Sequence, residues 1–152
     1  MSSVFLLPTG GDEVTALGST YHFKTDGSHV ADAYSLMEER FWAETTPLHA
    51  HPDAEESFYV LEGRVELWSD GITSEASSGA FIVVPRGTPH ALRRLSADPV
   101  RMLTIVSPPG FERIFAAVAA IGEEELLTDP ERLAALAAEY GTEVLGDYPE
   151  MR

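Results

Sequence analysis

Near the middle of the chain the sequence reads His49-Ala50-His51-Pro52-Asp53-Ala54-Glu55-Glu56, followed by the apolar segment Phe58-Tyr59-Val60-Leu61. In an extended segment, side chains two residues apart project to the same face, so both imidazoles can reach one point. Pro52-Asp53 permits a turn, after which Glu56 opens an apolar strand, where an inward-facing carboxylate needs a charged partner. The pattern therefore indicates ligands for a metal ion.

A second stretch adds another histidine. Residues 79–90 read Gly79-Ala80-Phe81-Ile82-Val83-Val84-Pro85-Arg86-Gly87-Thr88-Pro89-His90, so His90 directly follows a Pro-x-Gly turn between two apolar strands. A His-x-His pair alone occurs by chance, and a single glutamate is most often a solvated turn residue. Three histidines and one carboxylate at strand ends form a more specific pattern than the His-x-His pair or the glutamate alone.

The rest of the first two-thirds of the chain has the pattern of an all-β protein, because short strand-like segments alternate with clusters of Gly, Pro, Asp and Ser. Besides the apolar segment 57–61, we expect strands at 4–7, 13–17, 20–24, 33–42, 64–69, 80–84, 90–94 and 100–106.

After Pro108-Pro109-Gly110 the apolar residues recur at helical spacing up to Gly122, which predicts an amphipathic helix. A second helix is expected between Asp129-Pro130 and Gly141, with Thr128 or Asp129 as its cap. Many strands followed by two helices predict a sandwich or barrel over residues 1–107 and a helical extension over residues 108–152, packed on the barrel.

Composition excludes several classes of function. The chain has 152 residues and a formal net charge of −15, so its surface repels nucleic acid, and no basic run would attract an anionic membrane. The absence of cysteine excludes thiolate ligands and disulfides. The N-terminus does not have the pattern of a signal peptide and no apolar run could span a bilayer, which predicts a cytoplasmic protein.

The two stretches resemble the paired motifs of the cupin family. The first, Gly-x5-His-x-His-x(3,4)-Glu-x6-Gly, is matched by His49, His51, Glu56 and Gly63, although Ala43 replaces its leading glycine. The second, Gly-x5-Pro-x-Gly-x2-His-x3-Asn, is matched by Gly79, Pro85, Gly87 and His90, with Arg94 in place of its asparagine. The resemblance implies a jelly-roll β-barrel in which His49, His51, Glu56 and His90 bind one divalent metal ion, and it implies a homodimer.

The resemblance extends to Pro108-Pro109-Gly110-Phe111-Glu112-Arg113 and Asp129-Pro130-Glu131-Arg132-Leu133, which are similar to bacterial single-domain cupins grouped with quercetin 2,3-dioxygenases. It implies a dioxygenase acting on a small enolic, aromatic or polyketide-like substrate, with Glu56 as both ligand and general base. Three imidazoles and a carboxylate suit Fe, Ni, Mn, Cu or Zn equally. Two alternatives remain open: a non-oxidative isomerase, lyase or polyketide cyclase, and a non-catalytic binding protein.

Residues outside the two motifs give weaker predictions. Tyr34, Phe41, Phe58 and Phe81 are candidates for the substrate pocket, although such residues are more often barrel core. Arg94 shares strand parity with His90 and is expected to place a cation near the pocket. His22 and His29 are interpreted as surface or strand residues, and Glu38-Glu39-Arg40 as exposed and paired charges.

Overall fold

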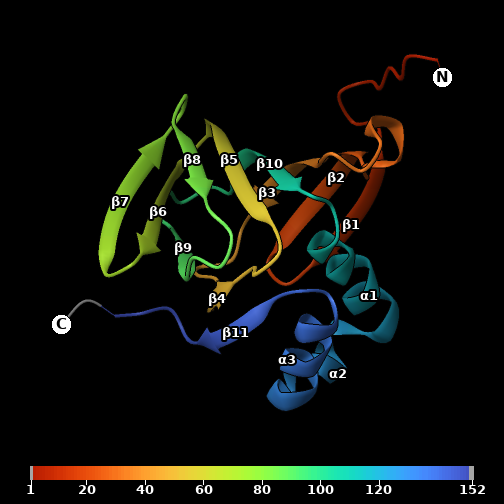
Figure 1. Ribbon diagram of the computed structural model, residues 1–152. Coiled ribbons are helices and arrows are strands. Elements are labelled where there is room, and N and C mark those ends of the chain that lie inside the picture. The colour runs from red at the N-terminus through yellow and green to blue at the C-terminus, as the bar shows by residue number, and fades with distance from the viewer. Residues whose placement is uncertain (1, 151–152) are drawn as a thin grey trace.

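The computed structural model describes residues 2–150, and its strands form two antiparallel sheets that face each other (Figure 1). The six-stranded sheet has the order β1-β2-β3-β10-β5-β8 and the five-stranded sheet the order β11-β4-β9-β6-β7. The strands are β1 (Asp12–Ala16), β2 (Ser19–Thr25), β3 (Ser35–Phe41), β4 (Leu48–Ala50), β5 (Glu55–Glu62), β6 (Arg64–Ser69), β7 (Ile72–Ser77), β8 (Phe81–Val84), β9 (His90–Arg94), β10 (Val100–Ser107) and β11 (Glu143–Gly146). The predicted all-β jelly-roll is confirmed.

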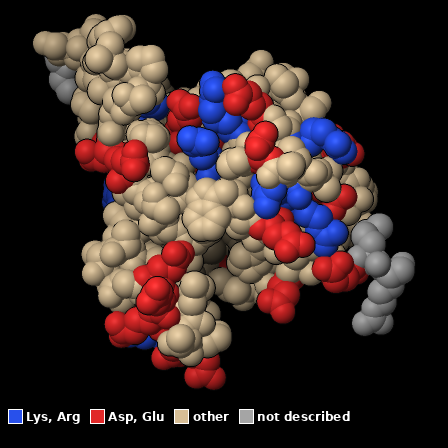
Figure 2. All heavy atoms as spheres, turned by 180° about the vertical axis from the view of Figure 1, so that it is seen from behind, with Lys and Arg blue, Asp and Glu red and all other residues tan. Residues whose placement is uncertain are grey.

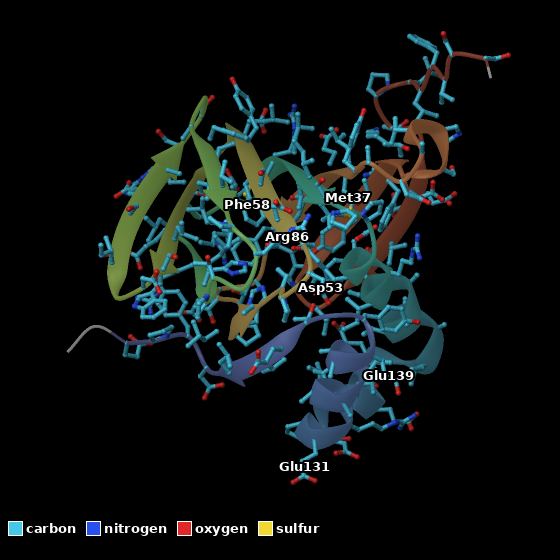
Figure 3. All side chains as sticks on the ribbon, viewed as in Figure 1. Met37, Asp53, Phe58, Arg86, Glu131 and Glu139 are labelled. Carbon is cyan, nitrogen blue, oxygen red and sulfur yellow. The ribbon has the colours of Figure 1, made fainter. Side chains whose placement is uncertain are left out.

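The core lies between the sheets because inward positions alternate with outward ones along each strand. On β10 the inward side chains are Val100, Met102, Thr104 and Val106, all buried. The main apolar cluster combines Val100 and Met102 with residues of both sheets, among them Phe41, Phe58 and Val65. In Figure 3, Met37 and Phe58 lie in this interior.

The turns before and after β6 need residues that adopt positive φ angles. Asp70 and Gly71 both have positive φ (51° and 80°), which suits the tight two-residue hairpin between β6 and β7. At Gly63, between β5 and β6, φ is 91° and an added Cβ would lie 2.9 Å from Ser96 Oγ and 3.1 Å from Val100 Cα. A glycine is therefore required at the position where the first motif ends.

The C-terminal segment contains the two predicted helices, α1 (Ile114–Ile121) and α3 (Pro130–Glu139), with a short helix α2 (Glu123–Leu127) between them. Two single-turn 3-10 helices, η1 (Ser28–Val30) and η2 (Phe111–Arg113), complete the secondary structure. Asp129 accepts a hydrogen bond from the backbone N–H of Arg132 and caps α3 as expected. The helices pack through Val118, Leu126 and Ala137 against Ala16 at the end of β1.

One expected strand is absent, and some of the observed strands were not predicted. Residues 4–7 form no strand, because no described strand pairs with them, and Phe5 is 86% exposed. Strand β7 was not predicted because it is a polar edge strand in which only Ala76 is buried. Strand β11, which pairs with β4, was also not predicted. Its four residues are all exposed, so no alternation of apolar and polar residues marks this segment as a strand.

Candidate metal centre

Three strands of the two sheets bring the four residues of the paired motifs together. Strand β4 carries His49 and leads directly into His51, whereas β9 begins at His90, which pairs with His49 in the sheet register. Strand β5, in the opposite sheet, supplies Glu56. One ligand atom from each of the four side chains lies within 4.8 Å of the others. This cluster could hold one metal ion.

Hydrogen bonds to the backbone orient two of the three imidazoles. The Nδ1 atom of His49 lies 2.8 Å from the carbonyl oxygen of Pro47, and that of His90 lies 3.0 Å from the carbonyl oxygen of Thr88. Because a carbonyl oxygen only accepts, each Nδ1 carries the proton and donates it. The Nε2 atoms are therefore the nitrogens left to face the cluster.

His51 is held by side chains from the C-terminal segment. Its Nδ1 lies 3.1 Å from Oγ1 of Thr142, and its ring stacks on Phe111 with 3.5 Å between ring centroids and 5° between ring planes. Such partners fix the tautomer and ring orientation of metal-binding histidines. The residues after the barrel thus contribute directly to the geometry of the cluster.

The donor set fits a divalent metal ion. The Nε2 atom of His51 is buried and, within residues 2–150, has no hydrogen-bond partner; it lies 3.6 Å from Oε1 of Glu56. The same oxygen lies 3.1 Å from Nε2 of His90. A buried polar atom without a partner is costly, and a cation at the centre of the cluster would satisfy it. Imidazole nitrogens and a carboxylate suit first-row transition metals.

The protonation states of His49 and Glu56 agree with this set of ligands. Burial, reinforced by His90, lowers the pKa of His49 to about 4, so that imidazole is neutral. Burial would raise the pKa of Glu56, but the charges and hydrogen bonds of His51 and His90 outweigh it and hold that pKa well below its ordinary value. Burial opposes charge on His90 as well, yet the hydrogen bond to Glu56 raises its pKa. Glu56 is therefore a carboxylate at neutral pH.

The cluster lies in the wall of a cavity of about 510 Å³ between the sheets and the C-terminal helices. Its apolar lining includes Phe58 from the barrel and Leu133 and Ala137 from α3. Val144 of β11 and Leu127 at the end of α2 also line it and are 40% and 59% exposed, so they lie toward solvent. A cavity of this size and character can bury a small aromatic molecule.

Of the five residues proposed for the substrate pocket, the structure places one, Phe58, in the cavity lining. Phe41 is buried in the core between the sheets, and Phe81 is 59% exposed on the outer face of β8. Tyr34 is half-buried and borders a separate surface hollow beside residues 2–6. Strand parity alone does not show whether an aromatic residue faces core, cavity or solvent.

Arg94 also lies outside the cavity lining. Its guanidinium donates hydrogen bonds to the carbonyl oxygens of Trp42 and Ala43 at 3.2 and 3.3 Å, and to those of Ser96 and Ala97 at 2.6 and 2.9 Å. These hydrogen bonds from Nε and Nη1 tie two loops together. The expected cation near the pocket is instead a structural residue, which anchors the chain after His90.

Three residues near the cluster were not identified from the sequence. Glu39 is 5% exposed and lines the cavity, so its interpretation as an exposed, paired charge is wrong. The available signal was its parity with Met37 and Phe41 on β3. Thr142 and Phe111 had no local signal, because they approach His51 only through tertiary contacts.

Acidic side chains gather over the helices beside the cavity, as the view from behind shows (Figure 2). They include Glu123, Glu124 and Glu125 in the first turn of α2 and Glu131 in that of α3. Glu131 and Glu139 point from α3 into solvent (Figure 3). Among the helices of residues 2–150, none is long and apolar enough to cross a membrane.

Comparison with known proteins agrees with the geometry. Residues 41–106 match the family model described as a cupin domain. A segment of 67 residues, 44% of this chain, is 36% identical to quercetin 2,3-dioxygenase of Bacillus subtilis and covers 20% of that protein. A segment of 60 residues, 40% of this chain, is 35% identical to the polyketide synthase CurC of Streptomyces cyaneus and covers 39% of it. Both matches span less than half of the curated relative.

A solved structure, that of the polyketide cyclase RemF from Streptomyces resistomycificus, has a similar fold. It is 29% identical to this chain, with a TM-score of 0.56, and the similarity covers 70% of this chain and 79% of that one.

Proposed function

Because this chain belongs to the cupin superfamily, we propose that it is a metal-dependent dioxygenase acting on a small enolic, flavonol-like or polyketide-like molecule. We assign one divalent ion (Fe, Ni, Mn, Cu or Zn) to His49, His51, Glu56 and His90. The observation that carries the proposal is that these four ligand atoms, within 4.8 Å of one another, lie in the wall of a largely apolar cavity of about 510 Å³.

The residues of the chain have separable roles in this reaction. A redox-active metal ion held by the four residues would supply Lewis acidity toward an enol oxygen and a route for electrons from the enolic substrate to dioxygen. Glu56, ionised and buried, accepts the enol proton as the substrate enters. The apolar lining, including Phe58 and Leu133, excludes water and holds the body of the substrate.

The C-terminal segment has a functional place in this proposal. We regard residues 1–107 as the barrel and residues 108–152 as a cover packed on it, not as an independent unit. Leu133, Ala137 and Val144 of the cover line the cavity, and Thr142 contacts His51. Loss of the cover would therefore affect both substrate binding and the metal ligands.

Reconstitution with single metals tests the oxidative reaction. Metal-free protein is loaded anaerobically with each of the five metals, mixed with quercetin and exposed to oxygen in an electrode chamber. We expect oxygen uptake that matches quercetin loss with at least one redox-active metal. Glu56→Gln should lose the rate, whereas Glu75→Gln, an exposed residue paired with Arg64, should keep it. No turnover of quercetin or other enolic compounds by fully loaded protein would contradict the proposal.

A non-oxidative cyclisation is the second candidate, because the chain is 29% identical to the polyketide cyclase RemF over 79% of that structure. In that reaction an ion held by His49, His51, Glu56 and His90 would supply only Lewis acidity toward a carbonyl group. Turnover of a linear polyketide by the zinc-loaded protein under nitrogen would favour this candidate. A requirement for oxygen would exclude it.

We further propose that two copies associate as a homodimer. Tyr59, Phe81 and Val83 are 41%, 59% and 54% exposed on neighbouring strands β5 and β8, where Tyr59 pairs with Phe81. Exposed apolar residues that adjoin one another often mark an interface. Light scattering should give twice the mass of the chain, and a monomeric mass would contradict the association.

A further inference from the structure

Glu39 is a second buried carboxyl in the cavity. It lies on β3, where Ser35, Met37, Glu39 and Phe41 all face inward. Its Oε2 accepts a hydrogen bond of 2.7 Å from Ser19 Oγ, and its Oε1 accepts one of 2.8 Å from Thr104 Oγ1. Hydroxyl groups from the two neighbouring strands thus hold the carboxyl in one orientation.

This carboxyl has no cationic partner. Within the described chain its side-chain hydrogen bonds come only from hydroxyl groups, and the described cavity lining contains neither lysine nor arginine. The titratable groups that face it across the cavity and from adjoining elements are Tyr21 on β2, Glu56 on β5, Glu123 on α2 and the three histidines of the cluster. An apolar residue would be less costly at this inward position. A role in binding or chemistry explains its presence.

The two glutamates of the cavity differ in protonation. Burial raises the pKa of Glu39 to about 7, against the opposing effect of the Ser19 and Thr104 hydroxyls, and the charge of Glu56 adds to this increase. The pKa of Glu56 is held far lower by its histidine partners. Paired carboxyls whose environments separate their pKa values commonly divide acid and base roles between them.

The position of Glu39 suits contact with a different part of the substrate. Glu39 pairs with Met102 of β10, which pairs with Val60 of β5, whereas Glu56 pairs with Val106. The backbone positions of the two carboxyls are therefore two strands apart, about 10 Å across the sheet, and four residues apart along β5, about 13 Å. Because both side chains line the same cavity, one flat molecule of several rings can contact both carboxyls at different atoms.

We propose that Glu39, in its neutral form, donates a hydrogen bond to a substrate oxygen other than the one bound at the metal centre, and so determines which oxygenated molecules bind and in which orientation. The inference rests on the proposed function, since it assumes an enolic substrate with a second oxygen. The neutral carboxyl has one O–H to donate, and because Glu39 lines the cavity a bound ligand can accept it. Ionisation would remove that donor and place a negative charge against the substrate.

The protonation of Glu39 can be measured without a ligand. In protein labelled with ¹³C at glutamate carboxyl groups, we expect one resonance that titrates near pH 7 and is absent from Glu39→Gln. Glu38→Gln serves as the matched control, because Glu38 is the adjacent glutamate but pairs with Arg101 outside the cavity. A Glu39 resonance that titrates together with the exposed glutamates would overturn the inference.

Quercetin affinity tests the contact itself. The zinc-loaded protein is titrated with quercetin under nitrogen at pH 6 and pH 8. At each pH the affinity of the wild type is divided by the affinity of Glu39→Gln, and this ratio cancels the effect of quercetin ionisation. Gln keeps an N–H donor but cannot ionise, so the ratio should fall about tenfold between the two pH values, following the neutral fraction of Glu39. Glu39→Leu, which lacks a donor, should bind about tenfold more weakly than Glu39→Gln at pH 6, and Glu38→Gln should behave as wild type.

The outcomes separate this inference from the proposed function. If the ratio of wild-type to Glu39→Gln affinity does not change with pH, the role of Glu39 alone is overturned. This test does not need Glu39→Leu, so it still decides the role of Glu39 if the Leu variant does not fold. A wild-type protein that binds no quercetin with any of the five metals would overturn the proposed substrate class, and this inference with it.

Discussion

Thr142 and His51 are 91 positions apart in the sequence, yet Oγ1 of Thr142 lies 3.1 Å from Nδ1 of His51. The contact exists because β11 (Glu143–Gly146) pairs with β4, the strand that leads into His51. A residue outside the barrel strands of the paired motifs therefore orients one of the four candidate metal ligands.

Thr142→Val should weaken metal binding. The substitution keeps the shape of the side chain but removes the hydroxyl that fixes the His51 ring, and loss of such a partner typically lowers metal affinity about 10- to 100-fold. Competition with a chelator measures the change. Thr142→Ser retains the hydroxyl and is the control; equal affinity of the Val variant and the wild type would show that His51 needs no such partner.

A larger side chain at the cavity rim should block substrate without affecting the metal. Val144 lines the cavity and is 40% exposed, so Val144→Trp would narrow the opening. We expect the KM for quercetin to rise about tenfold, equivalent to about 1.4 kcal/mol, with unchanged metal content. Leu145→Trp is the matched control, because Leu145 is 43% exposed on the same strand but does not line the cavity. Equal effects of the two variants would place the entrance elsewhere.

Stability should depend on pH through Glu39. Burial raises its pKa from 4.5 in the unfolded chain to about 7, so the folded state binds this proton more tightly. The resulting stabilisation is fully present below pH 4.5 and is lost as the pH rises to about 7, a change on the order of 3 kcal/mol. Urea unfolding of wild type and Glu39→Gln measures it.

Relative to wild type, Glu39→Gln should become more stable between pH 4.5 and 7, and the difference should level off above pH 7. Parallel stability curves for the two proteins would show that the pKa of Glu39 is not raised in the folded state.

The C-terminal residues should contribute to stability through Tyr148. This tyrosine is 7% exposed, donates a hydrogen bond to Glu66, and lies with its ring centroid 4.3 Å from the guanidinium carbon of Arg93. Tyr148→Phe should lower the free energy of unfolding by about 1 kcal/mol, because only the hydrogen bond is lost. Tyr34→Phe, at a half-buried position outside this contact, should have little effect in the same urea titration.

The sequence predicts the barrel and the cluster because their signals are local. Alternation on β10 and the paired histidine motifs are each contained in a short segment, and strand pairing then brings the segments together. Local sequence patterns do not predict the role of a residue whose neighbours come from distant segments of the chain. Glu39 has a charged side chain on an inward strand position, and Thr142 reaches His51 only through the pairing of β11 with β4.

The aromatic candidates illustrate the same limit. Phe41 and Phe58 both face inward and are 1% and 2% exposed, but only Phe58 lines the cavity. Which inward side chains border the cavity depends on where the helices and β11 stop filling the interior. That boundary is set by the packing of α1 to α3 against β1, which no strand pattern encodes.

Zinc titration of metal-stripped protein, read by native mass spectrometry and calorimetry, tests the four-ligand centre most directly. The wild type should bind one equivalent tightly, and His90→Ala should lose that site, because His90 is fully buried at the cluster. His22→Ala, which removes a histidine on β2 that contacts Glu13, should bind as wild type. Unchanged stoichiometry and affinity in His90→Ala, or no binding by the wild type, would contradict the assignment.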